Sequence, residues 1–301
     1  MRLQGDRAAH LSLATATFIF GLNYVITKSL VPGIFTPLQL VFIRLGGSII
    51  PLGIWGLITH SLDIQRKDIW RIGAAGLTGV AINQTFFFAG MARTSPLEAA
   101  IIHTANPLLV VLFASLFLGE KHYLINKLGI GVGALGALLL IFSRGKPDLH
   151  SEHFIGNLLI FINMSAYSAY MVIVKPLMRH YKPTTVMFWV FTAGFLWILP
   201  LSIPEIRRTP WEKLTVIDWF SVAYVVFFTT LLAFTLTVFG LRHLKAGTAA
   251  YYSYIQPFIA GIMGALAGYQ DFTGLMLFAG ILILAGAWMV SVKKNKVTAK
   301  T

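Results

Sequence analysis

Ten long apolar stretches constrain the fold of this chain more than any other feature. Each approaches the roughly 20 residues that an α-helix needs to cross the hydrocarbon core of a bilayer. They cover residues 11–30, 38–58, 72–90, 96–118, 124–142, 154–174, 184–203, 219–241, 246–268 and 272–292. The mean hydropathy of +0.74 and the charged fraction of 12% agree, because soluble domains carry about twice that charge. We therefore predict an all-α membrane protein with ten transmembrane helices.

The N-terminal region predicts an uncleaved membrane anchor. Arg2 and Arg7 precede a first apolar stretch that is too long for the apolar part of a secretory signal peptide. The chain has no cysteine, so neither disulfides nor thiol chemistry are expected.

The net charge of +13 would suit a nucleic-acid-binding protein, but the placement of the basic residues indicates membrane orientation instead. With the N-terminus in the cytoplasm, 16 of the 24 Lys and Arg residues fall on the cytoplasmic side and 7 on the other, with Arg44 inside a span. Cytoplasmic loops carry such an excess. We expect a multi-pass protein of the plasma (inner) membrane, surrounded by lipid, with both termini cytoplasmic and no nucleic-acid partner.

The chain also carries an internal duplication. Asn106-Pro107 is matched 150 residues later by Gln256-Pro257, and Gly90 by Gly240 at the same offset. The hydrophilic linker 143–153 separates five predicted helices from five. Because five is odd, the second set enters the membrane with opposite orientation. The prediction is two five-helix inverted repeats, residues 1–142 and 154–292, followed by a basic cytoplasmic tail at 293–301.

Short motifs in both halves resemble a known family. In the first half they are Ser95-Pro96, Ala99-Ala100, Pro107, Gly119-Glu120, Leu128-Gly129 and Gly136; the second half repeats the pattern at 246–257 and 280–286. Over nearly the whole chain this resembles an EamA-type ten-helix transporter of the drug/metabolite transporter superfamily. It departs where Tyr269-Gln270 replaces Gly-Glu and Ala279 replaces the glycine. The resemblance implies a small-metabolite carrier that works by alternating access, often an exporter. The superfamily's substrates are too varied to name one here.

The two amide-proline pairs are the first candidates for substrate binding. Asn106 and Gln256 lie near the middle of their predicted spans, where a polar group facing lipid is costly. The prolines after them, Pro107 and Pro257, have no amide hydrogen, so each frees a carbonyl one turn earlier and kinks its helix. An interhelical hydrogen bond with a kink is the alternative.

His103 precedes Asn106 by three residues, so both project from one helical face. It titrates near neutrality, which makes it a candidate for carboxylate recognition or proton coupling; a hydrogen-bonded packing role is the alternative. Other amides and phenols within spans are candidates to line a substrate cavity, with interfacial anchoring as the alternative for tyrosines. They are Asn23, Tyr24, Asn83, Gln84, Tyr167, Tyr170, Tyr251 and Tyr254.

Arg44 is the one strongly charged residue well inside a predicted span. An ion pair with Glu98, which lies at similar depth, would satisfy both charges and could act as a gate. Alternatively, Arg44 binds an anionic group of the substrate. The small residues Gly133, Gly136 and Gly286 recur on single helical faces and predict close helix packing.

Absences narrow the function. None of the eleven Asp and Glu residues is expected at a membrane midplane, which favours a zwitterionic or neutral solute over a strongly cationic one. No P-loop and no cluster of acids, His or metal ligands is present, which argues against an enzyme and against a cofactor or metal. We predict a secondary transporter for a small amino-acid-like or other zwitterionic or neutral metabolite, and we expect export, as the family resemblance implies. A channel or lipid-type flippase stays open as the alternative.

Overall fold

The computed structural model describes residues 2–118, 124–141, 151–243, 252, 255–269, 271 and 273–291, and these parts contain helices and their connections without any strand. Within these parts, six helical segments are long and apolar enough to cross a membrane. They are Arg7–Leu30, Pro37–Ile58, Arg66–Met91, Glu152–Val174, Pro183–Ile206 and Val216–Thr237. The other four predicted spans contain shorter or partly described helices.

The elements follow in chain order. The first half contains α1 (Arg2–Leu30), α2 (Pro37–Ile58), η1 (Arg66–Asp68), α3 (Ile69–Gly76), η2 (Leu77–Ile82), α4 (Asn83–Met91), α5 (Pro96–His103), α6 (Asn106–Leu118) and α7 (Leu124–Ile141). The second half contains α8 (Glu152–Val174), α9 (Leu177–His180), α10 (Pro183–Ile206), η3 (Trp211–Lys213), α11 (Val216–Ala223), η4 (Tyr224–Leu232), α12 (Ala233–His243), α14 (Gln256–Leu266) and α15 (Gly274–Ser291).

Local sequence explains where several helices begin. Thr36 accepts a hydrogen bond from the Gln39 amide, and the Gln39 side chain accepts one from the Thr36 amide in return, ahead of Pro37. Thr215 and Asp218 form the same reciprocal cap at the start of α11. These caps satisfy amides that the first helical turn leaves without partners. They fix the helix starts at the ends of the bundle.

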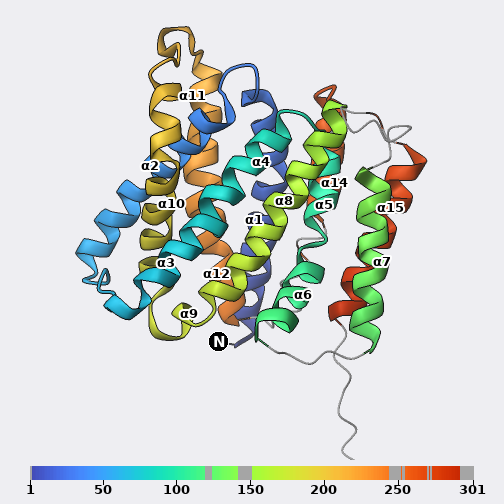
Figure 1. The fold of residues 1–301 in the computed structure, drawn as a ribbon, viewed down its shortest axis with the longest axis horizontal. Helices are drawn as coiled ribbons and strands as arrows, with labels where there is room; N and C mark the ends of the chain where they lie inside the picture. The colour runs from blue at the N-terminus through green and yellow to red at the C-terminus, as the bar shows by residue number, and fades with distance from the viewer. Residues whose placement is uncertain are drawn as a thin grey trace, which may run out of the picture.

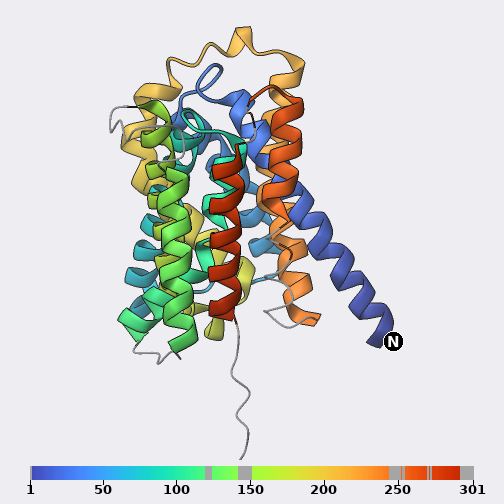
Figure 2. The same cartoon turned by 90° about the vertical axis from the view of Figure 1, so that its right-hand side faces the viewer.

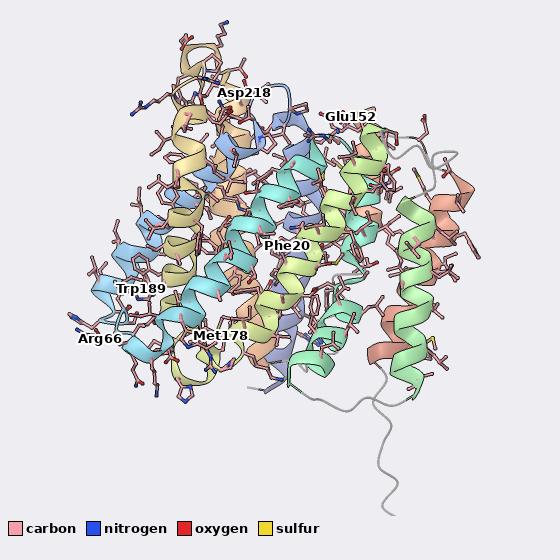
Figure 3. All side chains as sticks on the ribbon, in the orientation of Figure 1. Phe20, Arg66, Glu152, Met178, Trp189 and Asp218 are labelled. Atoms are coloured by element: carbon pink, nitrogen blue, oxygen red, sulfur yellow. The ribbon has the colours of Figure 1, made fainter. Side chains whose placement is uncertain are left out.

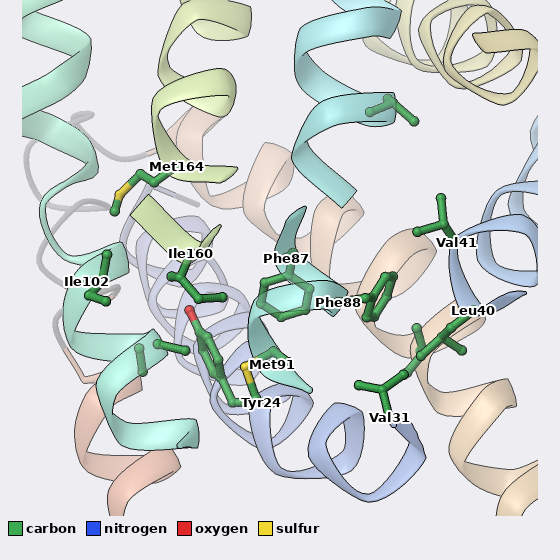
Figure 4. Close-up of a cluster of buried hydrophobic side chains, with 14 of the residues drawn as sticks. Tyr24, Val31, Leu40, Val41, Phe87, Phe88, Met91, Ile102, Ile160 and Met164 are labelled. Carbon is green, nitrogen blue, oxygen red and sulfur yellow. The ribbon is translucent and has the colours of Figure 1, made fainter. Parts of the chain in front are cut away.

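Helices from the two halves interleave in one bundle (Figure 1). From the second half, α10 packs against α2 and α3, and α8 packs against α4 and α6; α1 packs against α12 and α14. Buried apolar side chains fill the space between them, among them Tyr24, Phe88 and Ile160 (Figure 4). The bundle interior therefore contains groups from both halves.

The predicted fourth span, 96–118, is not one continuous helix. α5 ends at His103, and α6 begins at Asn106. Between them, the Thr104 and Ala105 amides donate to carbonyls only three residues back, at Ile101 and Ile102. A proline in the second position of a helix tolerates the missing amide hydrogen, whereas one in mid-helix does not. The prediction of a kinked helix is thus wrong in detail, because the chain breaks the helix and restarts it.

Two π-helical segments occur at related places in the two halves. η2 covers Leu77–Ile82 and η4 covers Tyr224–Leu232, so their first residues are 147 apart. Each interrupts a membrane-length helix, between α3 and α4 and between α11 and α12. In a π-helical segment the backbone hydrogen bonds span five residues instead of four, and such segments are often found at functional sites. The residues in and beside η2 and η4 are therefore candidates for a functional site.

Small residues bring α7 and α15 together, as predicted (Figure 2). A Cβ atom added at Gly136 would lie 2.8 Å from the Ala279 carbonyl oxygen, and one added at Gly286 would lie 2.6 Å from that of Gly129. At Gly133 it would meet the Leu108 side chain. The predicted packing role of these glycines is therefore confirmed, since any side chain would push the backbones apart.

The two ends of the bundle differ in their segments (Figure 3). Arg66 and Met178 lie at the end where the chain begins, whereas Glu152 and Asp218 lie at the opposite end. The two ends of the bundle therefore hold different loops, and the distribution of basic residues predicts these loops on opposite sides of the membrane.

Candidate functional site

The amide-proline pairs each stand at the start of a helix inside the bundle. Asn106 begins α6, and the Ser168 hydroxyl of α8 donates to its Oδ1 at 2.9 Å. Gln256 begins α14 with Pro257 next, and its half-buried carboxamide makes no hydrogen bond with the described residues. The Asn106 side chain thus joins α6 to α8, whereas the Gln256 carboxamide keeps its donors and its acceptor available.

His103, at the end of α5, lies in an aromatic cluster with Tyr24 and Phe87. Its ring centroid lies 5.6 Å from that of Tyr24 and 5.8 Å from that of Phe87, both edge-on. Its Nδ1 lies 2.8 Å from the Ala99 carbonyl, which favours the tautomer with the hydrogen on Nδ1 and leaves Nε2 as an acceptor. Tyr24 is 5% exposed, and its hydroxyl has no partner among the described residues.

Asn83 and Asn163 form a reciprocal link between α4 and α8. The Asn83 Nδ2 donates to the Asn163 carbonyl at 3.2 Å, and the Asn163 Nδ2 donates to the Asn83 carbonyl at 2.7 Å. Asn163 is 1% exposed, and its side chain also faces His103. The adjacent Gln84 is half-buried without a side-chain hydrogen bond to any described residue. Asn83 therefore has a structural partner, while Gln84 remains open.

The π-helical segment η4 places two hydroxyls against the first two helices. The Thr229 hydroxyl donates to the Asn23 Oδ1 of α1 at 3.0 Å. The next hydroxyl, that of Thr230, donates to the Val225 carbonyl at 2.9 Å, five residues back. Thr230 also accepts from the Arg44 Nε at 3.0 Å. Asn23 and Arg44 are thus held by neighbouring residues of one segment.

The predicted Arg44–Glu98 pair is not formed. The Arg44 guanidinium lies over the Phe88 ring, 5.8 Å from its centroid, besides its bond to Thr230. Glu98 is fully buried elsewhere, at the N-terminal end of α5. The prediction was wrong because helical spacing gives depth but not which neighbour each side chain faces.

Glu98 has its own polar neighbourhood between α5 and α8. The Thr94 hydroxyl lies between the Glu98 carboxylate, at 2.6 Å, and the Asn157 carboxamide. The His153 Nδ1 lies 3.6 Å from the Glu98 Oε2. Nearby, Lys28 donates to the Met91 and Ala92 carbonyls at the end of α4, which stabilises that helix terminus.

Tyr167 and Tyr170 lie together on α8, with ring centroids 5.7 Å apart. Tyr170 packs against η2, where a Cβ atom added at Gly79 would lie 2.3 Å from its ring. Tyr251 and Tyr254 lie outside the described residues. One apolar cavity of about 280 Å³ lies apart from these polar groups, between α3 and α8, lined by residues including Trp70, Arg71 and Pro176.

Thr229, Thr230 and Ser168 were not singled out from the sequence. The available signal was a pair of adjacent hydroxyls in an otherwise apolar run. Ser and Thr hydroxyls within a helix usually bond to a carbonyl of the same helix, so no contact with another helix was expected for them. The structure shows that these three also bond to other helices.

These features define a helical membrane protein whose described interior carries amides, hydroxyls, the imidazole of His103 and the guanidinium of Arg44. A model of the EamA-like transporter family matches residues 7–142 and 154–292. The chain therefore belongs to the EamA-like transporter family, as the sequence motifs suggested. Membership indicates an integral membrane transporter rather than an enzyme.

Relatives agree with this class. The chain is 27% identical over 290 residues to the uncharacterized transporter YetK of Bacillus subtilis, with 96% of this chain and 88% of the relative covered. It is 25% identical to the aromatic amino acid exporter YddG of Ancylobacter novellus, covering 81% and 83%. It is 21% identical to a probable terminal-alkyne amino-acid exporter of Streptantibioticus cattleyicolor, covering 75% and 74%.

One crystal structure is similar over most of its length. Its TM-score is 0.62 at 23% sequence identity, and the alignment covers 94% of this chain and 97% of that chain. At this identity the likeness concerns the fold.

Proposed function

We propose that this protein is a secondary transporter that exports a small amino-acid-like or other zwitterionic or neutral solute by alternating access. The observation that carries the proposal is a set of polar side chains inside the bundle that come from both halves of the chain. Asn23, Tyr24, His103 and Asn106 come from the first half, and Gln256 comes from the second.

Hydrogen-bonding capacity left open in the interior supports a solute site. The Gln256 carboxamide and the Tyr24 hydroxyl have no hydrogen-bond partner among the described residues. An open polar group in a membrane interior is costly unless water or a solute satisfies it. Two relatives that are named as amino-acid exporters support that solute class and direction.

The broken and π-helical elements support movement between two states. Interrupted helices near the midplane are typical of carriers, whose substrates bind where backbone groups are free. We propose that α5–α6 and α14 belong to two inverted five-helix repeats, with ten spans in total and both chain termini in the cytoplasm. The two separate stretches that the family model matches support this division.

His103 is proposed to contribute to solute binding and is the candidate for proton coupling. With Nδ1 directed at the Ala99 carbonyl, its Nε2 can accept a hydrogen bond from a solute when the ring is neutral. Tyr24 and Phe87 flank the ring and give the site an apolar wall.

Counterflow in proteoliposomes tests the proposal. Purified protein would be reconstituted, loaded with a high concentration of an unlabelled amino acid, and diluted into a trace of the same labelled compound. A carrier produces transient, saturable accumulation of label, whereas a channel dissipates the gradient without exchange. Label movement without exchange would contradict the carrier mechanism.

Two substitutions test the site. Asn106→Ala and Gln256→Ala are expected to raise the half-saturating solute concentration about 5- to 20-fold, as the loss of one hydrogen bond predicts. Ser165→Ala is the matched control, because that hydroxyl donates only to the Phe161 carbonyl of its own helix. Unchanged saturation in both amide variants would remove these residues from the site.

A further inference from the structure

The guanidinium of Arg44 lies inside the bundle and uses only part of its hydrogen-bonding capacity there. It lies on α2 between Val41 and Ser48, both fully buried, so it shares the inward face of that helix. Of its five N–H donors, only the one at Nε bonds to a described residue, the Thr230 hydroxyl at 3.0 Å. The donors at Nη1 and Nη2 form no hydrogen bond with the part of the chain that the structure describes.

Among the described residues, no acidic side chain forms an ion pair with Arg44. The close contacts between basic and acidic side chains in these ranges join Arg93 to Glu152 and His153 to Glu98, and neither involves Arg44. The Phe88 ring face, 5.8 Å from the guanidinium carbon, provides a cation–π contact. A cation–π contact of this kind does not replace a counterion in a membrane interior.

The surroundings fix the orientation of the guanidinium. The Thr230 hydroxyl uses its hydrogen on the Val225 carbonyl, so only its lone pairs face the Arg44 Nε. The guanidinium carbon lies over the Phe88 ring, 5.8 Å from its centroid. With Nε bonded to Thr230, the N–H groups at Nη1 and Nη2 form a planar fork that matches both oxygens of a carboxylate.

Arg44 also stands close to the proposed solute groups. Thr229 and Thr230 are adjacent, and they hold Asn23 and Arg44 respectively. Phe88 joins Arg44 to the aromatic cluster, because its ring lies 5.3 Å from that of Phe87 (Figure 4). The Phe87 ring in turn contacts those of Tyr24 and His103. A solute that bonds to Arg44 at one end can therefore contact this cluster at the other.

We propose that Arg44 binds the carboxylate of the transported solute, with Thr230 as the residue that positions the guanidinium. The inference rests on the proposed transport function and narrows its substrate class to solutes with a free carboxylate. A zwitterion with an apolar or aromatic side chain fits best, because Phe88 contacts the guanidinium and the rings of Phe87 and Tyr24 follow it in succession.

Matched ligand pairs test the carboxylate. Purified full-length protein in lipid nanodiscs would be heated with each L-amino acid and with its carboxamide, and unfolding would be followed by tryptophan fluorescence. At least one amino acid is expected to raise the unfolding temperature in a saturable way. Its carboxamide is expected to bind 10- to 100-fold more weakly, because it lacks the charge-assisted pair of hydrogen bonds.

Variants test the residue. Arg44→Gln is expected to abolish the preference for the acid over the amide, and Arg44→Lys to retain it in part, since the charge remains and the fork is lost. Thr230→Val is expected to weaken acid binding several-fold while Thr230→Ser restores it. Arg71→Gln removes an equal charge beside Trp70, away from the proposed site, and is expected to behave as the parent.

Three results would contradict the proposed carboxylate site. Equal binding of acid and amide by the parent, an acid preference that survives Arg44→Gln, or an absence of binding by every amino acid would overturn it. Counterflow of an uncharged solute would then leave the transport function standing, whereas its absence would remove both. If Arg44→Gln does not fold, the Thr230→Val and Thr230→Ser pair gives the same decision.

Discussion

At the residue scale, polar side chains in the bundle fall into two groups. Asn83, Asn163 and Asn23 bond to neighbouring helices, so their first role is to fix helix positions. Gln256 and the terminal nitrogens of Arg44 lack such partners in the described structure. Because a polar group without a partner is costly in a low-dielectric interior, the second group is where a solute is best accommodated.

The Asn83–Asn163 link is expected to stabilise the fold. Asn163→Leu keeps approximate volume but removes the 2.7 Å donation to the Asn83 carbonyl. Interhelical hydrogen bonds in membranes contribute about 1 kcal/mol, so the free energy of unfolding should fall by about that amount. Denaturant unfolding in micelles measures it, with Ser165→Ala as the same-helix control. Equal stability of the two variants would contradict the structural role of the link.

At the element scale, the informative features are the interruptions of helices. Two residues separate the end of α5 at His103 from Asn106, which begins α6 with Pro107 in its second position, and α14 begins with the corresponding Gln256-Pro257. The π-helical segments η2 and η4 interrupt two further spans. Such interruptions release backbone groups or shift side chains by a fraction of a turn, and η4 contains Thr229 and Thr230, which bond to α1 and α2.

A glycine in η2 is expected to be required for packing. A Cβ atom at Gly79 would lie 2.3 Å from the Tyr170 ring, whereas one at Gly73, in α3, meets nothing within 4 Å. Gly79→Ala should lower the free energy of unfolding by about 1–3 kcal/mol through overpacking. Gly73→Ala should leave it unchanged or raise it by up to about 1 kcal/mol, because alanine favours the helix.

Thermal unfolding of the two glycine variants in the same detergent measures the difference. Comparable unfolding temperatures for Gly79→Ala and Gly73→Ala would show that η2 and α8 separate readily, contrary to the close approach in the structure.

At the scale of the whole molecule, the two halves share one interior. α10 packs on α2, α8 on α4, and α15 on α7, so every one of these contacts joins residues of one family match to residues of the other. A relative movement of the halves would therefore change the surroundings of Arg44, His103 and Asn106 together. This coupling is what alternating access requires.

The membrane orientation is expected to follow the basic residues. Lys67 follows Arg66, and Lys213 lies in η3, five residues before Asp218; both lysines are exposed. Arg66 lies at the end of the bundle where the chain begins and Asp218 at the opposite end. Because the chain contains no cysteine, Lys67→Cys and Lys213→Cys each introduce a single label site. A membrane-impermeant maleimide added to intact cells should label the cysteine at 213, and the one at 67 only after permeabilisation. The reverse pattern would overturn the cytoplasmic placement of the termini.

The sequence alone determined the membrane class, the family and the helical nature of the chain, because long apolar runs and small-residue motifs are local properties of the chain. It also located Asn106, Gln256 and Arg44 in apolar surroundings, and it predicted a packing role for the glycines of α7 and α15 without their partner helix. The Arg44–Glu98 pairing failed, and the break at Thr104–Ala105, the π-helical segments and the role of Thr230 were not foreseen. Those features depend on which helices become neighbours. Only tertiary packing places Thr230, 186 residues away in sequence, beside Arg44, and only that contact shows which of its donors remain open to a solute.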